Sequence, residues 1–227
     1  MLNQESAYGS NNYKEVHELL LTERFHSIQG EGKYIGIPMY FIRTNLCNLR
    51  CKWCDSTYTF SGGEEVPLFD LISDIKSISE NWICFTGGEP MLQREAIQFM
   101  KECTAIGKNV LLETGGSLNL SNVVKISGTY IDMDIKTPSS GEHESLYREN
   151  LSFLRESDYV KFVISDETDY NYAFSFIEQW KSRAEILFQP AWGTELKWLV
   201  EKVLEDKLNV RVLPQLHKII WGTRRGV

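Results

Sequence analysis

Residues 39–56 read MYFIRTNLCNLRCKWCDS, an apolar strand-like run that leads directly into a polar loop with three cysteines. Similar runs, each rich in β-branched or aromatic residues, recur along the chain and predict strands. They lie at residues 19–29, 39–44, 82–87, 109–114, 130–136, 159–165, 185–190 and 209–217. Apolar residues at helical spacing predict helices between most of these strands, at residues 67–79, 91–106, 170–183 and 195–207.

The alternation of strands and helices predicts an α/β fold in which parallel strands are joined by right-handed crossovers. A doubly wound sheet and a complete or partial βα barrel both satisfy this pattern. The length of 227 residues suits one such domain. Both folds build their sites at the carboxyl ends of the strands. The cysteine loop, which follows a strand, is therefore expected at the functional end of the molecule.

The composition favours a small-molecule partner. With 24 Lys plus Arg against 31 Asp plus Glu, the net charge is −7, which disfavours binding to a nucleic-acid backbone. No stretch approaches the ~20 apolar residues of a membrane span, and the N-terminus lacks the pattern of a signal peptide. The odd number of cysteines, 5, argues against a secreted disulfide framework. We therefore expect a cytoplasmic protein with free thiols and no direct contact with nucleic acid or a membrane.

The cysteines Cys47, Cys51 and Cys54 have the spacing C-x3-C-x2-C. A structural zinc site normally takes four ligands in two pairs, and the remaining Cys84 and Cys103 are isolated. A 4Fe–4S cluster normally takes four thiolates, so three clustered cysteines leave one iron open to a chelating small molecule. A zinc site and three unrelated buried cysteines remain the alternatives.

Three further motifs end predicted strands. In FTGGEP (85–90) two glycines let a ligand approach the backbone, and Glu89 is a suitable acceptor for an ammonium group. ETGG (113–116) and DIKTPSSG (134–141) follow the next two strands. Each also has a plain interpretation: an ordinary strand-to-helix turn, a buried glutamate in a turn, and a Pro/Ser/Gly loop.

The stretch from residue 22 to residue 56 places polar and glycine residues between two strands ahead of the cysteines. Gln29 can donate and accept hydrogen bonds, Gly30 frees the backbone, and Arg43 presents a planar fork suited to a carboxylate. This set suits a flat heterocycle that bears an acid. A hairpin in which Arg43 forms a salt bridge is the alternative.

The cysteine triplet, with Trp53 before its third member, resembles the signature of the radical S-adenosylmethionine superfamily. Its context is narrower: SIQGEG, G-x-P-x-x-F-I-R, C-N-L-x-C-x-W-C-D, TGGEP, ETGG, P-S-S-G, Q-P and Q-L-H-K occur in this order. Together they resemble the 7-carboxy-7-deazaguanine synthase family. The resemblance implies a partial βα barrel of the radical SAM type as the core domain over residues 22–227, and leaves residues 1–21 as an N-terminal extension.

Site residues follow from the resemblance position by position. It implies that a 4Fe–4S cluster is held by Cys47, Cys51 and Cys54. It implies contacts to S-adenosylmethionine from Trp53, Asp55, Gly88, Glu113, Asp134, Ile135, Lys136 and Gln189. It implies contacts to a pterin from Ile28, Gln29, Gly30, Glu31, Arg43, Thr86 and His217. Mg²⁺ is expected at the hydroxyl of Ser56, with the adjacent Thr57 as the alternative.

The implied reaction is that of a radical SAM carbon–nitrogen lyase. It converts 6-carboxy-5,6,7,8-tetrahydropterin to 7-carboxy-7-deazaguanine with loss of ammonia, on the route to 7-deazapurine (queuosine- or archaeosine-type) nucleosides of tRNA. The resemblance also implies a homodimer and a one-electron donor such as flavodoxin or ferredoxin. Two alternatives are an activating enzyme of the glycyl-radical type, which acts on a protein, and a non-catalytic zinc or iron–sulfur module.

Overall fold

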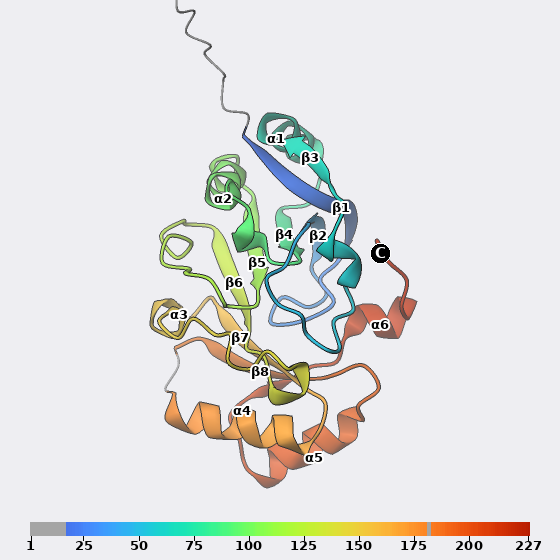
Figure 1. Cartoon of the computed structure of the whole chain (residues 1–227), viewed down its shortest axis with the longest axis vertical. Helices are drawn as coiled ribbons and strands as arrows, with labels where there is room; N and C mark the ends of the chain where they lie inside the picture. Colours follow the sequence, from blue (N-terminus) through green and yellow to red (C-terminus); the bar gives the residue numbers. More distant parts are fainter. Residues whose placement is uncertain (1–16, 181–182) are drawn as a thin grey trace, which may run out of the picture.

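The computed structural model describes residues 17–180 and 183–227. Its nine strands form one sheet in the order β3-β1-β2-β4-β5-β6-β7-β8-β9 (Figure 1). The strands are β1 (Glu18–Ile28), β2 (Pro38–Thr44), β3 (Glu64–Pro67), β4 (Trp82–Gly87), β5 (Asn109–Thr114), β6 (Thr129–Asp134), β7 (Tyr159–Ile164), β8 (Glu185–Pro190) and β9 (Arg211–Val212).

Strands β2 and β4 to β9 run parallel to one another, as the alternation predicts. Strand β1 is antiparallel to both β2 and β3 and extends the sheet at one side. Within the described residues, the two edge strands β3 and β9 do not pair with each other, so the sheet stays open. This is a partial βα barrel, and the predicted fold class is confirmed.

The helices follow the strands that they connect. They are α1 (Leu68–Ser77), α2 (Ala96–Ala105), α3 (Asn150–Phe153), α4 (Glu167–Gln179), α5 (Leu196–Glu205) and α6 (Leu216–Trp221), with short 3-10 helices η1 (Thr57–Phe60), η2 (Pro90–Leu92) and η3 (Pro138–Ser140). Helices α1 to α5 line the outside of the curved sheet, whereas α6 lies near its open side (Figure 1). Within the described ranges, every helix falls short of the length and hydrophobicity that a membrane span requires.

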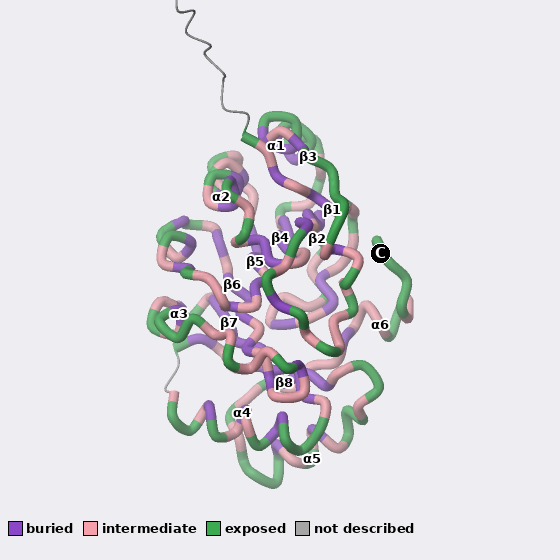
Figure 2. The backbone as a smooth tube through the Cα atoms, in the orientation of Figure 1, coloured by how far each residue is buried: buried purple, intermediate pink, exposed green. Residues whose placement is uncertain are grey.

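The two faces of the sheet separate because successive strand side chains point in opposite directions. On the outer face, alternate residues such as Ile83, Leu112 and Phe162 join the helices in the main hydrophobic core. On the inner face, a smaller cluster forms a floor from Met39, Phe41, Cys84, Leu111, Tyr159 and Leu187. The strands are mostly buried, and the exposed residues gather on the outer turns of the helices (Figure 2).

The same alternation of side chains determines which polar strand residues point into the cavity. The next inward positions beyond the floor residues on β2, β4, β5, β7 and β8 are, in order, Arg43, Thr86, Glu113, Lys161 and Gln189. The same parity places Asp132 and Asp134 of β6 inside. The floor is therefore apolar and the cavity above it is polar.

The structure differs from the sequence predictions in several elements. The predicted strand at 209–217 is a strand only at Arg211–Val212, and Leu216 begins helix α6. The predicted helix at 91–106 begins at Ala96, after the 3-10 turn η2. Strand β1 begins at Glu18, so its first residues belong to the sheet and not to the extension predicted for residues 1–21. The rest of that extension, through residue 16, lies outside the described residues.

Candidate active site

A cavity of about 510 Å³ opens at the carboxyl ends of the strands. Its wall includes every site residue predicted from the sequence except Ile135. The Ile135 side chain is fully buried in the outer core, so the structure gives no support for a side-chain contact there. Residues separated by up to 189 positions, from Ile28 to His217, thus meet in one place, because parallel strands end at one edge of the sheet.

The three cysteines of the loop after β2 are free thiols, each partly exposed to this cavity. Burial raises the pKa of the Cys47 thiol, and burial, against the opposing charge of Lys136, raises the pKa of Cys51 to about 11. Among the described residues, no three His, Cys, Asp or Glu side chains are arranged to hold a single metal ion. A structural zinc ion normally takes four protein ligands, whereas three thiolates on a 4Fe–4S cluster leave one iron open to a chelating molecule.

Backbone contacts fix the cysteine loop. The Arg50 Nη1 atom donates to the carbonyl of Cys47 at 2.7 Å, and the guanidinium lies over the Phe60 ring. On the other side, the Lys52 amide donates to the Ser140 carbonyl at 2.9 Å. The Trp53 Nε1 atom donates to the hydroxyl of Ser139 at 3.0 Å. The P-S-S-G loop is therefore a support for the cysteine loop.

The TGGEP turn lies against the same loop. A Cβ on Gly88 would fall 1.9 Å from the Leu46 carbonyl oxygen, so only glycine allows this approach. The Glu89 carboxylate, a candidate acceptor for an ammonium group, belongs to the cavity wall and also bonds within the protein. It accepts hydrogen bonds from the backbone N–H of Met91 and of Gly115 and from the Thr114 hydroxyl. Glu89 thus joins the two glycine turns.

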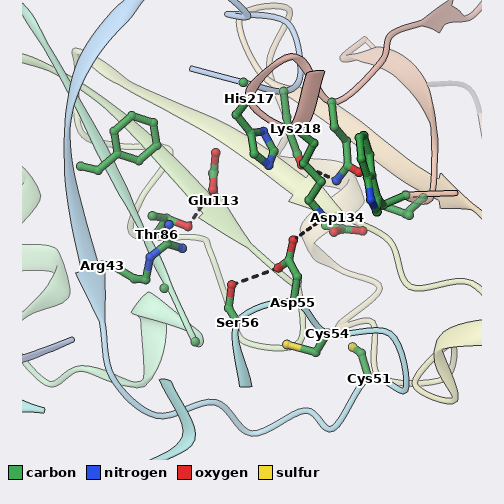
Figure 3. A pocket seen from close by; sticks show the side chains of 18 of the residues that line it. Arg43, Cys51, Cys54, Asp55, Ser56, Thr86, Glu113, Asp134, His217 and Lys218 are labelled. Carbon is green, nitrogen blue, oxygen red and sulfur yellow. Dashed lines mark hydrogen bonds and ion pairs between the residues drawn. The ribbon is translucent and has the colours of Figure 1, made fainter. Parts of the chain in front are cut away.

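One half of the cavity carries the residues predicted to contact a pterin. Arg43 donates through Nε to Glu23 at 2.7 Å, which is the salt bridge considered as the alternative role for Arg43. The carboxylate of Glu113 accepts from Gln29 Nε2 at 2.8 Å and from the Thr86 hydroxyl at 2.7 Å (Figure 3). Glu113, predicted to contact the cosubstrate, is therefore bonded to two residues of the pterin set.

The loop between β1 and β2 meets the start of α6. The Leu216 amide donates to the Gly30 carbonyl at 2.8 Å. His217 packs against Gly30 so closely that a Cβ there would lie 2.3 Å from its Nδ1 atom. The glycine at residue 30 is therefore required by this contact, and it brings His217 into the cavity (Figure 3).

The residues after the third cysteine form a separate polar group. The Ser56 hydroxyl donates to the Asp55 carboxylate at 3.0 Å, and Lys218 of α6 pairs with the same carboxylate at 2.8 Å (Figure 3). Ser56 lines the cavity, whereas Thr57 does not. Between the two hydroxyls predicted for a magnesium ion, the position of Ser56 is the suitable one.

Several buried polar atoms in the wall lack a protein partner. Both side-chain amide atoms of Gln189, Oδ1 of Asp134 and Oε1 of Gln215 are buried without a hydrogen bond. A buried polar group without a partner is costly, so these atoms indicate contacts to a bound molecule. The donor set, with three thiols at one end and amide and carboxylate groups at the other, fits a cluster with S-adenosylmethionine and a polar heterocycle.

Comparisons with known proteins agree with this geometry. Residues 41–159 match the model of the radical SAM superfamily. The chain is 48% identical to 7-carboxy-7-deazaguanine synthase from Thermoplasma acidophilum over 92% of this chain and 100% of the relative. The enzyme of that name from Koribacter versatilis is 40% identical over 88% of this chain and 96% of the relative. The chain belongs to the 7-carboxy-7-deazaguanine synthase family.

The fold agrees with that of a solved structure. The crystal structure of QueE from Escherichia coli superimposes with a TM-score of 0.75 at 19% identity, covering 88% of this chain and 95% of that one. Family membership confirms the predicted enzyme class, a radical SAM lyase of 7-deazapurine biosynthesis that uses a 4Fe–4S cluster and S-adenosylmethionine. The alternatives of a glycyl-radical activating enzyme and of a non-catalytic module are thereby set aside.

The structure reveals further site residues that sequence reasoning missed. Tyr58, Asp132, Lys161, Gln215 and Lys218 line the cavity, and Glu23 bonds to Arg43. Asp132 and Lys161 did carry a signal, because a charged residue in the middle of an apolar parallel strand is exceptional. Gln215 and Lys218 stand in the Q-L-H-K motif, of which only His217 was predicted as a site residue. Glu23 carried no signal, since its place depends on how the β1–β2 hairpin folds.

Proposed function

We propose that this chain converts 6-carboxy-5,6,7,8-tetrahydropterin to 7-carboxy-7-deazaguanine with release of ammonia. One observation carries the proposal: a single cavity brings three free thiols within the same walls as the Arg43, Gln29 and Glu31 side chains. The thiols supply a place for radical chemistry, and the polar set supplies recognition of a small acidic heterocycle. A cavity of about 510 Å³ matches small-molecule ligands.

Cys47, Cys51 and Cys54 are proposed to hold the 4Fe–4S cluster. When bound, the cluster supplies the single electron that splits S-adenosylmethionine and so starts radical chemistry on the pterin. The protein's task is to hold the reacting carbon of the pterin in place and to exclude water. The apolar floor of Met39, Leu111 and Leu187 closes the cavity from below.

Recognition of the pterin is proposed to divide between its two ends. The guanidinium of Arg43, held at Nε by Glu23, is suited to the carboxylate of the substrate. Carboxylates accept hydrogen bonds, and a pterin ring presents N–H donors, so Glu31 and Glu113 are proposed to bind its heterocyclic edge. Ile28, Gly30, Thr86 and His217 complete the pterin side.

The cosubstrate side is proposed to use the rest of the predicted set. The unpartnered amide of Gln189 and the free Oδ1 atom of Asp134 support this role, since both are buried in the cavity wall. Trp53, Asp55, Gly88 and Lys136 lie near the cysteine loop and line the same wall. Ser56 is proposed to hold Mg²⁺, because a hydroxyl oxygen is a suitable ligand for that ion.

We also propose partners and a cellular location for this chain. A one-electron donor such as flavodoxin or ferredoxin is proposed to reduce the cluster, and the chain is proposed to form a homodimer in the cytoplasm. The free state of all five cysteines supports a reducing compartment.

Anaerobic reconstitution tests the function directly. The holoenzyme is incubated with dithionite, S-adenosylmethionine, Mg²⁺ and the carboxypterin, and the product is followed by mass spectrometry. We expect 7-carboxy-7-deazaguanine and ammonia in equal amounts. Cleavage of S-adenosylmethionine without any deazaguanine product would contradict the proposed substrate while leaving the radical SAM chemistry intact.

A further inference from the structure

Lys161 is the one charged residue of strand β7, whose sequence is YVKFVI. Its side chain is 7% exposed and points inward, toward the cavity. Burying an ammonium group is costly unless it is paired and hydrogen-bonded. The contacts of the Lys161 side chain therefore indicate its role.

Two carboxylates from different elements converge on this ammonium group. The Lys161 Nζ atom donates to Glu31 Oε2 at 2.7 Å and to Asp132 Oδ2 at 3.2 Å. Glu31 lies in the loop between β1 and β2, whereas Asp132 lies on β6, the strand next to β7. Asp132 is 1% exposed, so its charge faces Lys161 and not solvent.

Glu31 is held at both of its oxygens. The Gln215 Nε2 atom donates to Glu31 Oε1 at 2.8 Å, while Lys161 takes the other oxygen. The Glu31 side chain is 19% exposed and lies in the half of the cavity that carries Gln29. These contacts within the protein therefore fix the orientation of the Glu31 carboxylate.

We propose that Lys161, with Asp132 as its buried counter-charge, is a positioning residue that holds Glu31 as an anion aimed at the heterocycle and thereby sets the affinity for the pterin. The inference rests on the proposed function, because it concerns how that same cavity binds its substrate. Lys161 acts through Glu31, whose two oxygens accept hydrogen bonds from ring N–H donors.

The electrostatics of the site support this role. Burial alone would raise the pKa of Glu31, but the charges of Lys161 and His217 hold it well below its ordinary value. Burial raises the pKa of Asp132 to about 7 in spite of Lys161. The other charged groups that face the pair are Glu113, Asp134 and Lys136 and, toward Glu31, Asp55. Without Lys161, this acidic group would have to lose negative charge by taking up a proton.

The test compares Lys161→Met and Lys161→Arg with the wild type as reconstituted, full-length holoenzymes. Lys161→Met keeps the volume and removes the charge, and Lys161→Arg keeps the charge. We expect KM for the carboxypterin to rise about tenfold or more in Lys161→Met with a smaller change in kcat, and to recover most of the way in Lys161→Arg. Fluorescence titration with 6-carboxypterin gives the same comparison at equilibrium.

The pH dependence of KM distinguishes a positioning role of Lys161 from a purely structural one. In Lys161→Met, burial raises the pKa of Glu31, so KM should fall as the pH rises from 6 toward 9, where Glu31 ionises. The wild type should lack this step, because Lys161 keeps Glu31 ionised over the whole range, and Asp132→Asn alone reports any effect of Asp132, whose pKa is about 7. Adding Asp132→Asn to Lys161→Met should move the new step to lower pH, because one competing negative charge is gone.

The outcomes separate this inference from the proposed function. Cleavage of S-adenosylmethionine without pterin is measured in every variant at equal cluster content, so that a loss confined to pterin binding is separated from a general loss of the site. Failure of the wild type to form product would overturn the proposed function. If Lys161→Met has the same KM and the same pH profile as the wild type, Lys161 does not position Glu31. The same conclusion follows if this variant loses cosubstrate cleavage and turnover to the same extent. If Lys161→Met does not fold, Lys161→Gln decides the same points.

Discussion

The Nε atom of Arg43 donates a hydrogen bond to Oε1 of Glu23 at 2.7 Å, and the two side chains are only 18% and 20% exposed. They face each other across the β1–β2 pair, where their residues are register partners. Glu23 also accepts from the Tyr58 hydroxyl at 3.1 Å and lies 3.8 Å from Arg225 near the C-terminus. Because the contact uses Nε, it fixes the plane of the guanidinium while its terminal nitrogens remain available to a ligand carboxylate.

The substitution Glu23→Gln tests this relationship. Gln keeps a neutral acceptor but loses the charge-assisted bond, so the guanidinium of Arg43 should be held less firmly. We expect KM for the carboxypterin to rise about fivefold, which corresponds to about 1 kcal/mol. Cosubstrate cleavage in the absence of pterin should not change.

Asp74→Asn is the matched control, because Asp74 forms an ion pair with Arg24 at 3.0 Å on the exposed side of the same strand. An exposed pair contributes little, so KM should be that of the wild type. An unchanged or lower KM in Glu23→Gln would show that Glu23 does not position Arg43 for the substrate.

Substituting a loop cysteine and substituting a buried cysteine should have different effects on the iron content of the protein. Cys51→Ala should abolish incorporation of the cluster, because only two thiolates would remain in the loop. Cys103→Ala is the control, since Cys103 is buried in α2 and should load iron normally. Iron and sulfide analysis with the visible absorption spectrum measures the outcome. Normal cluster loading in Cys51→Ala, or bound zinc in the wild type, would contradict the assignment of this loop.

Much of the fold could be predicted from the sequence because parallel strands buried on both faces are nearly continuous apolar runs. The strand over Tyr159–Ile164 is such a run, and its bounds were predicted to within one residue. Of the strand predicted at 209–217, only Arg211–Val212 is a strand. The LPQLHKII stretch that follows has too few residues for helical periodicity to show, and contacts to the β1–β2 loop, such as that between the Leu216 amide and the Gly30 carbonyl, fix the helix there.

The site could be predicted where a motif carries the chemistry, as at the cysteines, and less well where the chemistry depends on folding. Glu89 lines the cavity, and its carboxylate also binds the Thr114 hydroxyl and the Gly115 amide, contacts that the TGGEP motif alone does not predict. Lys161 was overlooked because its partner Glu31 is 130 residues away in the sequence. Such long-range pairs become visible only once the strand order is known.

Helix α4 offers a test of stability that leaves the cavity alone. The Asp166 carboxylate caps this helix by accepting a hydrogen bond from the Asp169 amide at 2.9 Å. Asp166→Ala should lower the free energy of unfolding by about 1 kcal/mol. Asp166→Asn, which keeps a capping oxygen, should cost much less. Urea denaturation measures both, and equal losses in the two variants would show that charge, and not capping, matters at this position.

The raised pKa of Asp132 predicts how stability depends on pH. Burial raises it from the ordinary value of 3.8 to about 7, so the folded protein binds a proton that the unfolded chain releases. The stabilising contribution of the protonated carboxyl is therefore complete below about pH 4 and is lost as the pH rises toward 7. Asp132→Asn cannot ionise and escapes this loss.

We therefore expect Asp132→Asn to gain in stability relative to the wild type between pH 5 and pH 7. The upper limit of the gain is about 1.4 kcal/mol per pH unit, the value for one proton. Urea denaturation at pH 5, 6 and 7 measures it, and Asp70→Asn, on the exposed face of α1, controls for the loss of one carboxylate. A gain that is the same at all three pH values would mean that Asp132 stays ionised beside Lys161. Both carboxylates would then be anions over this whole range, and Lys161 would pair with the two of them throughout.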